Sequence, residues 1–249
     1  MSEIPPFVHL HNHSDYSLLD GASRLDLLVD IALDMEMPAL ALTDHGNMYG
    51  ALKFYNTVNK KNKDRAKEGK SLLNPIIGCE VYVAKESRHK RSGSGDQSNH
   101  LILLAENDEG YRNLTKLVSY GFLEGFHYKP RIDKELLYQY GKGLIAASAC
   151  LKGAVAQKIS MDQTEGAVSE ALELRDIFGD GNFYLELQDH GLPEQKRVSP
   201  ILIDISRKTG IPLICSNDTH YLRRDDSEAH DVLLCIGTGK KARDGPSAL

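Results

Sequence analysis

The sequence predicts an α/β fold built from repeating strand and helix units. Short apolar runs rich in β-branched residues alternate with longer amphipathic segments from one end of the chain to the other. This alternation is typical of sheets whose strands are connected by helices. The length of 249 residues also suits an α/β barrel of about 250 residues. The sequence therefore favours one parallel βα-repeating architecture, either open or closed.

Two kinds of segment carry this prediction. Seven short apolar runs predict strands, namely Phe7–His11, Ala39–Thr43, Ile76–Val83, His100–Ala105, Leu144–Ser148, Phe183–Gln188 and Pro212–Ser216. Between them, apolar residues at three- and four-residue spacing predict helices that face a core. These helices are Arg24–Asp34, Met48–Asn62, Glu109–Phe122, Thr164–Phe178, Glu194–Lys208 and Asp226–Ile236.

No change in composition marks a second domain. We therefore expect residues 1–236 to form a single domain and residues 237–249, which lack an apolar pattern, to be a linker or a truncated tail. The segment 85–99 is first basic and then rich in Gly and Ser, which predicts a long loop between two strands.

Targeting and cysteine patterns predict a soluble cytoplasmic protein. The first 30 residues contain no basic segment followed by an apolar run, and no stretch approaches about 18 consecutive apolar residues. We therefore expect no membrane partner. The four cysteines lie far apart without a CxxC pair, which argues against a disulfide framework and for a reducing compartment.

The charge balance limits how the chain could bind nucleic acid. Thirty basic and 35 acidic residues give a net charge of -5. This is not typical of a free-standing protein that holds nucleic acid by its phosphates. A nucleic-acid substrate would need a partner or a local basic patch.

The ten histidines of the chain are unevenly spread. His11 and His13 are two residues apart at the end of a predicted strand, so their side chains should project to one side while Asn12 points away. Such a pair occurs often by chance. The same spacing recurs in Asp218 and His220 after another predicted strand, which favours a shared metal site.

Further metal-ligating residues lie in or beside the other predicted strands. Asp44 and His45 follow one strand, Glu80 lies within an apolar run, His100 opens a strand and Cys150 follows another. Each has an ordinary alternative role, as an edge charge, a core histidine or a small buried residue. Because the carboxyl ends of parallel strands face one way, together they predict a site for zinc, manganese or iron.

Several motifs resemble one family. They are LHNHSDYSLLDGA, ALTDHGNMYGALKFY, GCEVYVA, NHLILLA, SAC and SNDTHY. They resemble the PHP (polymerase and histidinol phosphatase) superfamily, and more closely the N-terminal PHP domains of bacterial DNA polymerase III alpha subunits. The stretches EGFHYKPRID and QDHGLPEQK extend the resemblance from residue 7 to residue 236. It implies a distorted (β/α)7 barrel with a metal site at the C-terminal ends of the strands.

The resemblance also implies a ligand set for three divalent metal ions (Zn, Mn or Fe). His11, His13 and Asp218 would bind one metal, and Glu80 would bridge it to a second. The remaining ligands would be His100 and Cys150 on that second metal, and Asp20, His45 and His220 on the third. A thiolate at Cys150 favours zinc, whereas much of the superfamily has histidine there. Asp44 would orient one of the metal-bound histidines.

This resemblance implies a metal-dependent phosphoesterase, foremost a proofreading 3′-5′ exonuclease that hydrolyses phosphodiesters with a metal-activated water in a trinuclear site. Its partners would be a DNA 3′ end or a phosphate ester, the remainder of the polymerase alpha subunit, and other replisome subunits. On this interpretation, Glu80, Asp218 and His220 are expected to be catalytic. His190 would donate a proton, and Arg131 and Lys129 would contact phosphate.

Two other functions remain open from the sequence. One is a small-molecule phosphatase of the histidinol-phosphatase type. The other is a structural module that binds metals for stability and serves polymerase folding or subunit contact, because metals bound only by the native state add to its stability.

Overall fold

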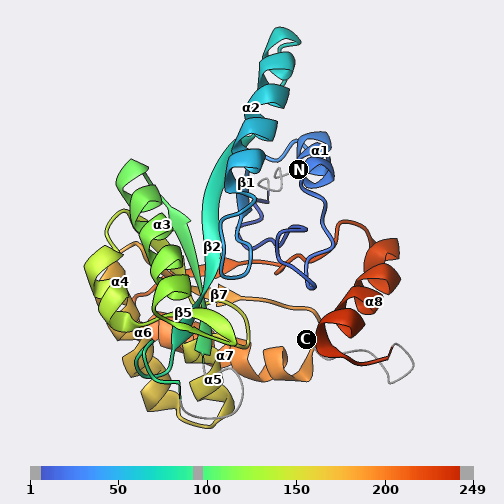
Figure 1. The fold of residues 1–249 in the computed structure, drawn as a ribbon. Coiled ribbons are helices and arrows are strands. Elements are labelled where there is room, and N and C mark those ends of the chain that lie inside the picture. Colours follow the sequence, from blue (N-terminus) through green and yellow to red (C-terminus); the bar gives the residue numbers. More distant parts are fainter. Residues whose placement is uncertain (1–6, 92–97, 242–249) are drawn as a thin grey trace. The chain divides into compact units, whose positions relative to one another are not determined.

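The computed structural model describes residues 7–91 and 98–241. It confirms the α/β class, and helices and strands alternate along the chain (Figure 1). The described residues form two compact units. The first unit contains residues 7–45, 49–77 and 218–241, and the second contains residues 46–48 and the described residues of 78–217. The middle of the expected loop (92–97) and most of the expected tail (242–249) lie outside the described residues.

The first unit combines two neighbouring strands with helices from both ends of the chain. β1 pairs in parallel with the first four residues of β2, from Asn74 to Ile77. Leu25, Phe54 and Val58 are buried in its core together with Leu40 of β1. Its elements are α1 (Leu25–Asp34), β1 (Ala39–Leu42), α2 (Ala51–Lys67), the start of β2 (Asn74–Ala84), the short 3-10 helix η1 (Arg224–Asp226) and α8 (Ser227–Thr238).

The expected strand Phe7–His11 is replaced by isolated bridges. His9 bridges to Leu40, and Asn12 bridges to Thr219. The His13 amide donates to the Thr219 carbonyl at 2.8 Å, and the Thr43 amide donates to the Asn12 carbonyl at 3.0 Å. The segment is therefore held in place by backbone hydrogen bonds to β1 on one side and to the chain at Thr219 on the other, without a continuous ladder.

The second unit contains the remainder of β2 and one mixed sheet, in the strand order β4-β5-β2-β3-β6-β7-β8. Helices α3, α5, α6 and α7 pack against its strands (Figure 1), and Leu103, Leu117, Phe183 and Leu202 belong to its core. The elements after β2 are β3 (Ser98–Ala105), α3 (Asp108–Leu123), β4 (Phe126–His127), β5 (Lys129–Ile132), α4 (Lys134–Tyr140), β6 (Leu144–Ala147), α5 (Ala154–Ser160), α6 (Thr164–Phe178), β7 (Phe183–Leu187), α7 (Pro193–Thr209) and β8 (Leu213–Cys215).

The expectation of an all-parallel sheet is wrong at β3. This strand is antiparallel to both β2 and β6, whereas β6, β7 and β8 are parallel neighbours. The described part of the connection from β2 to β3 contains no helix, and parallel neighbours need a long crossover, usually a helix. The short elements α4, α5, β4 and β5 also went unpredicted, because their apolar patterns are too brief to stand out.

No helix within residues 7–91 and 98–241 has both the length and the apolar character that crossing a bilayer requires.

A close backbone contact fixes the start of α3 against the chain before β6. Gly110 is the third residue of α3, and its amide donates to the Asn107 side chain that caps the helix. A Cβ atom at Gly110 would lie 1.7 Å from the Gly143 carbonyl oxygen. Only glycine permits this approach, because the opposing atom belongs to the backbone and cannot rotate away.

We expect Gly110→Ala to lower the free energy of unfolding by about 1–3 kcal/mol, because the new methyl group forces the two backbones apart. Gly166 is the matched control: it is the third residue of α6, and a Cβ there has its nearest neighbours at 3.7 Å. Gly166→Ala should be neutral or stabilising by up to about 1 kcal/mol. Denaturant unfolding of both variants tests this, and equal losses would contradict the close contact.

Candidate metal centres

His11 and His13 point to one side of their extended segment, as their spacing predicts. Their Nε2 atoms lie 3.1 Å apart, and both side chains are buried. The Asn12 side chain is directed elsewhere, since its amide nitrogen donates to the carbonyl oxygens of His9 and Ala41, each at 3.0 Å. The backbone bridges on either side of this segment therefore fix the direction of both imidazoles.

The Asp218 carboxylate completes a group of three ligand atoms with these histidines. Its Oδ1 lies 3.1 Å from His11 Nε2 and 3.2 Å from His13 Nε2. Among the described residues this buried oxygen receives no hydrogen bond of ordinary geometry. Burial raises the pKa of Asp218, but the positive charges that His11 and His13 carry when protonated hold it well below its usual range. The arrangement suits a cation placed among the three atoms.

A second group in the same unit is formed by His13, His45 and His220. The imidazole of His13 stacks on those of His45 and His220, with ring centroids 3.9 and 4.3 Å apart. Asp20 lies beside the group: its Oδ2 is 2.9 Å from His45 Nε2, and its Oδ1 is 3.5 Å from His220 Nε2. Burial raises the pKa of Asp20, but the hydrogen bond from His45 and the nearby imidazoles lower it far more.

Hydrogen bonds behind two of these imidazoles select their tautomers. The Ser17 hydroxyl donates to Asp44 Oδ1 at 2.8 Å, so at 3.1 Å it accepts from His13 Nδ1. His220 Nδ1 lies 2.9 Å from the backbone carbonyl oxygen of Asp218, which can only accept. Both rings therefore carry their proton on Nδ1, and their Nε2 lone pairs face the ligand groups.

Ser14 and Ser17 support the candidate ligands, although the sequence motifs do not indicate them. Both hydroxyl groups and the Ser14 amide donate to Asp44. Burial raises the pKa of Asp44, and these hydrogen bonds oppose the rise. Ser17 also accepts from the His45 amide at 3.0 Å. Ser17 thus connects Asp44 to His13 by hydrogen bonds. In the sequence, both serines stand close to the histidine pair, which is the signal that could have indicated them.

His230 is a further residue whose place was not predicted, since its position on α8 matches an ordinary core residue. The side chain is buried, and its Nε2 donates to the backbone carbonyl of Asp20 at 2.8 Å. It therefore holds the loop that carries the Asp20 carboxylate.

The second unit contains a separate group of Glu80, His100 and Cys150. His100 Nδ1 lies 2.7 Å from Glu80 Oε1 and 3.7 Å from Cys150 Sγ. The antiparallel pairing of β2 and β3 places His100 opposite Tyr82, two residues beyond Glu80. His100, the third residue of β3, thus lies at the C-terminal part of β2 and joins a carboxylate from that strand.

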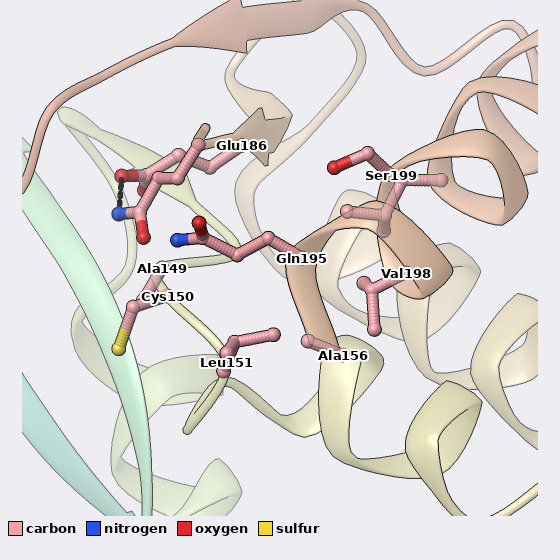
Figure 2. A pocket seen from close by; sticks show the side chains of 10 residues that line it. Ala149, Cys150, Leu151, Ala156, Glu186, Gln195, Val198 and Ser199 are labelled. Atoms are coloured by element: carbon pink, nitrogen blue, oxygen red, sulfur yellow. Dashed lines mark hydrogen bonds between the residues drawn. The ribbon is translucent and has the colours of Figure 1, made fainter. Parts of the chain in front are cut away.

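A small cavity lies beside this group (Figure 2). Cys150 lines it together with Gln188 and Glu186, whose side chains are hydrogen-bonded at 3.0 Å, and with residues of α7 such as Gln195. Its volume of about 20 Å³ holds one water molecule and is too small for a nucleotide. The cavity is therefore not a substrate site.

The donor types of all three groups fit divalent metals. Imidazole nitrogens, carboxylate oxygens and one thiol are the ligands of zinc and related transition metals, whereas magnesium and calcium prefer oxygen. All nine residues predicted as ligands thus lie in or beside one of the three groups.

The structure contradicts the expected role of Arg131 in phosphate binding. This side chain is 2% exposed, and its guanidinium donates to the backbone carbonyl oxygens of Gly125, Arg88 and Lys90. Lys129 differs: it is exposed, and its ammonium lies 5.1 Å from the centre of the Tyr82 ring. Lys129 is therefore the one that can contact an anion.

His190 is exposed, but both of its ring nitrogens are engaged. Its Nε2 lies 2.9 Å from the Asn217 carbonyl oxygen, to which it donates, and its Nδ1 accepts from Gln195 at 2.9 Å. Proton donation by His190 would require the bond to Asn217 to break. The observed contacts instead hold the carbonyl of the residue that precedes Asp218.

The sequence model of the PHP domain family matches residues 9–190. The chain is 50% identical to a DNA polymerase III subunit alpha of Treponema pallidum and 48% identical to one of Borreliella burgdorferi, covering 98% and 96% of this chain and 20% of each relative. The chain thus spans about a fifth of the length of these relatives. A solved structure from Bifidobacterium adolescentis, provisionally described as a metal-dependent phosphoesterase, has a TM-score of 0.48 at 14% identity and covers 87% of this chain and 88% of its own.

We expect Ser17→Ala to weaken zinc binding about 10- to 100-fold, because His13 loses the acceptor that keeps its proton on Nδ1. The measurement is a competition titration of chelator-treated protein against a zinc-binding dye. Ser169→Ala, which removes an exposed serine hydroxyl on α6, is the control and should bind like the wild type. Unchanged affinity in Ser17→Ala would show that the hydrogen bond has no part in metal binding.

Cobalt provides a direct test of Cys150 as a ligand. We expect the cobalt-loaded protein to show thiolate-to-cobalt charge-transfer absorption, because a thiolate bound to the metal is deprotonated. Cys150→Ser should abolish this band, whereas Cys215→Ser, at an exposed cysteine of β8, should retain it. A band that survives in Cys150→Ser would exclude Cys150 from the metal's ligands.

Proposed function

The chain belongs to the PHP domain family, and we propose that it is a metal-dependent phosphoesterase that acts as a 3′-5′ exonuclease on DNA. The observation that carries the proposal is the clustering of imidazole nitrogens and carboxylate oxygens into groups whose atoms lie about as close as ligands around one ion. Groups of this kind that are backed by fixed hydrogen bonds are suited to catalysis as well as to binding.

We propose that three metal ions are bound, with zinc favoured where Cys150 contributes. His11, His13 and Asp218 would hold one ion. The other ligands would be Asp20, His45 and His220 in the first unit, and Glu80, His100 and Cys150 in the second. When bound, such ions supply Lewis-acid chemistry that acidifies water and neutralises charge on phosphoryl oxygens.

The chain's own residues prepare this chemistry in three ways. The depressed pKa values of Asp20 and Asp218 keep both carboxylates anionic at neutral pH. The hydrogen bonds from Nδ1 of His13 and of His220 aim lone pairs at the ligand groups. In the second unit, the exposed ammonium of Lys129 is available to a phosphate oxygen.

DNA is the substrate that the relatives favour. Proteins named DNA polymerase III subunit alpha are 39–50% identical to this chain, and a phosphodiester at a 3′ end is the bond that a proofreading activity must cleave. The remainder of such a polymerase subunit, and other replisome subunits, are the partners that we propose. A small phosphate ester is the alternative substrate, and a purely structural use of the metals is the alternative function.

The proposal predicts release of mononucleotides from the 3′ end of a 5′-labelled primer when Mn²⁺ or Zn²⁺ is present. Asp218→Asn should lower the rate by about 100-fold or more, because the carboxylate shared by His11 and His13 loses its charge. His89→Ala, at an exposed histidine, should retain the wild-type rate. The rates are read from denaturing gels of a time course.

Three results would contradict the exonuclease. Equal activity of Asp218→Asn and the wild type would assign the activity to a contaminant. Cleavage of histidinol phosphate or p-nitrophenyl phosphate far faster than DNA would identify a small-molecule phosphatase. The absence of hydrolysis with every metal and substrate, together with a melting temperature that falls on chelation, would favour the structural function.

A further inference from the structure

Helix α2 carries a charge opposite to that of the whole chain. Its 17 residues include six Lys or Arg and a single acidic residue, Asp64, which gives the helix a net charge of +5. The complete chain has a net charge of -5. The basic residues are Lys53, Lys60, Lys61, Lys63, Arg65 and Lys67.

These charges are not distributed evenly around α2. Phe54 and Val58 form the buried face together with Ala51. The exposed face has residues spaced by three or four positions, which therefore lie in one row along the helix. This row, the lysine stripe, consists of Lys53, Asn56, Lys60, Lys63 and Lys67, all of them exposed. At 1.5 Å per residue it is about 21 Å long.

Both basic residues of α2 beside the stripe make polar contacts within the fold, whereas only Lys67 of the four stripe lysines forms an ion pair with a described residue. Lys61 pairs with Asp30, and Arg65 donates to the Ser71 carbonyl oxygen at 2.7 Å. Within the stripe, Lys67 pairs with Asp64 at 2.9 Å. Lys60 and Lys63 form no ion pair with any described residue. The centre of the stripe therefore presents two cations to solvent.

We infer that the lysine stripe binds the phosphate backbone of a nucleic acid. Lys60 and Lys63 are about 4.5 Å apart along the helix axis, and Lys63 and Lys67 are about 6 Å apart. A nucleic-acid strand repeats its negative charge at comparable intervals, one per about 3.4 Å of duplex axis. A straight row of cations fits a regularly charged polymer better than an acidic protein segment, in which the charges are irregularly spaced.

Two exposed tyrosines lie near the start of the helix. Tyr49 is 60% exposed and Tyr55 is 50% exposed. Exposed aromatic rings can stack on the bases of a single strand. Tyr55 is not three or four residues from any member of the lysine stripe, so the stripe alone carries the inference.

The start of α2 lies beside the histidine-rich part of the first unit. A Cβ atom at Gly50, the N-cap of the helix, would be 3.3 Å from Asp44 Oδ2, and Asp44 precedes His45 in the chain. The C-terminal half of the helix extends beyond α1 and β1 (Figure 1). A strand bound along the stripe would thus lead towards the ligand groups. Binding itself requires no metal and no hydrolysis, so it does not depend on the proposed function.

The test is the binding of fluorescein-labelled single-stranded and duplex oligonucleotides to the 249-residue chain, followed by anisotropy in EDTA over a range of KCl concentrations. The variant Lys60→Gln/Lys63→Gln removes the two central cations. Its matched control is Lys196→Gln/Lys208→Gln, which removes two exposed lysines from α7, a helix of the same length. Both variants change the net charge equally, and their melting temperatures report on folding.

We expect the α2 variant to bind DNA about tenfold more weakly at low salt. The slope of log K against log salt concentration should become shallower by about 1.4 for a single strand and about 1.8 for a duplex, as two phosphate contacts are lost. The α7 control should stay within about twofold of the wild type. The metal-loaded α2 variant should hydrolyse p-nitrophenyl phosphate at the wild-type rate. This measurement distinguishes a loss of DNA binding from a failure of the proposed function.

Three outcomes would overturn the inference. Equal weakening in both variants would show that only net charge matters, and no weakening in either would show that DNA binds elsewhere or not at all. Displacement of the labelled DNA by polyglutamate as effectively as by unlabelled DNA with the same number of charges would identify the stripe as a surface for acidic protein segments.

Discussion

The contact of the Asp218 carboxylate with the imidazoles of His11 and His13 is the constraint on which the first unit depends. A carboxylate removed from water loses several kcal/mol of solvation unless nearby groups compensate for it. Here two buried imidazoles approach one oxygen at 3.1 and 3.2 Å, and they depress the pKa of Asp218 in spite of its burial. This compensation works only if the segments around residues 11 and 218 are held together. The backbone bridges to β1 and between Asn12 and Thr219 are therefore as necessary as the ligands.

Hydrogen bonds one step behind the ligands determine what each ligand can do. Ser17 connects His13 to Asp44, and His230 fixes the carbonyl of Asp20. His190 fixes the carbonyl of Asn217. In each case a neutral or buried group directs a donor or an acceptor without entering the ligand group itself. An imidazole whose Nδ1 is already committed has only Nε2 left for a cation, so these contacts convert a cluster of histidines into an ordered set of ligands.

The sequence predicts which residues are candidate ligands better than it predicts the strand topology that brings them together. Strand ends could be recognised because apolar runs stop there, and helix Thr164–Phe178 has the same bounds in the structure as in the prediction. The direction of β3 could not be predicted, since a short apolar run has the same sequence pattern in parallel and antiparallel sheets. Arg131 was misjudged because a basic residue in a polar stretch resembles a surface residue, whereas its guanidinium holds three carbonyl groups inside the fold. The role of Ser17 was not predicted, because serine is common in loops.

The negative net charge of the whole chain leaves room for a local basic patch, and α2 is one. The helix carries +5 in a chain of -5, so the remaining residues together carry -10. A polyanion near such a chain is attracted to α2, while the remaining residues carry a net negative charge, which restricts the orientations in which it can bind. The acidic background therefore does not oppose binding at the lysine stripe. It makes a strand along α2 the favoured orientation, and that strand would arrive at the N-terminal end of the helix, which lies beside Asp44.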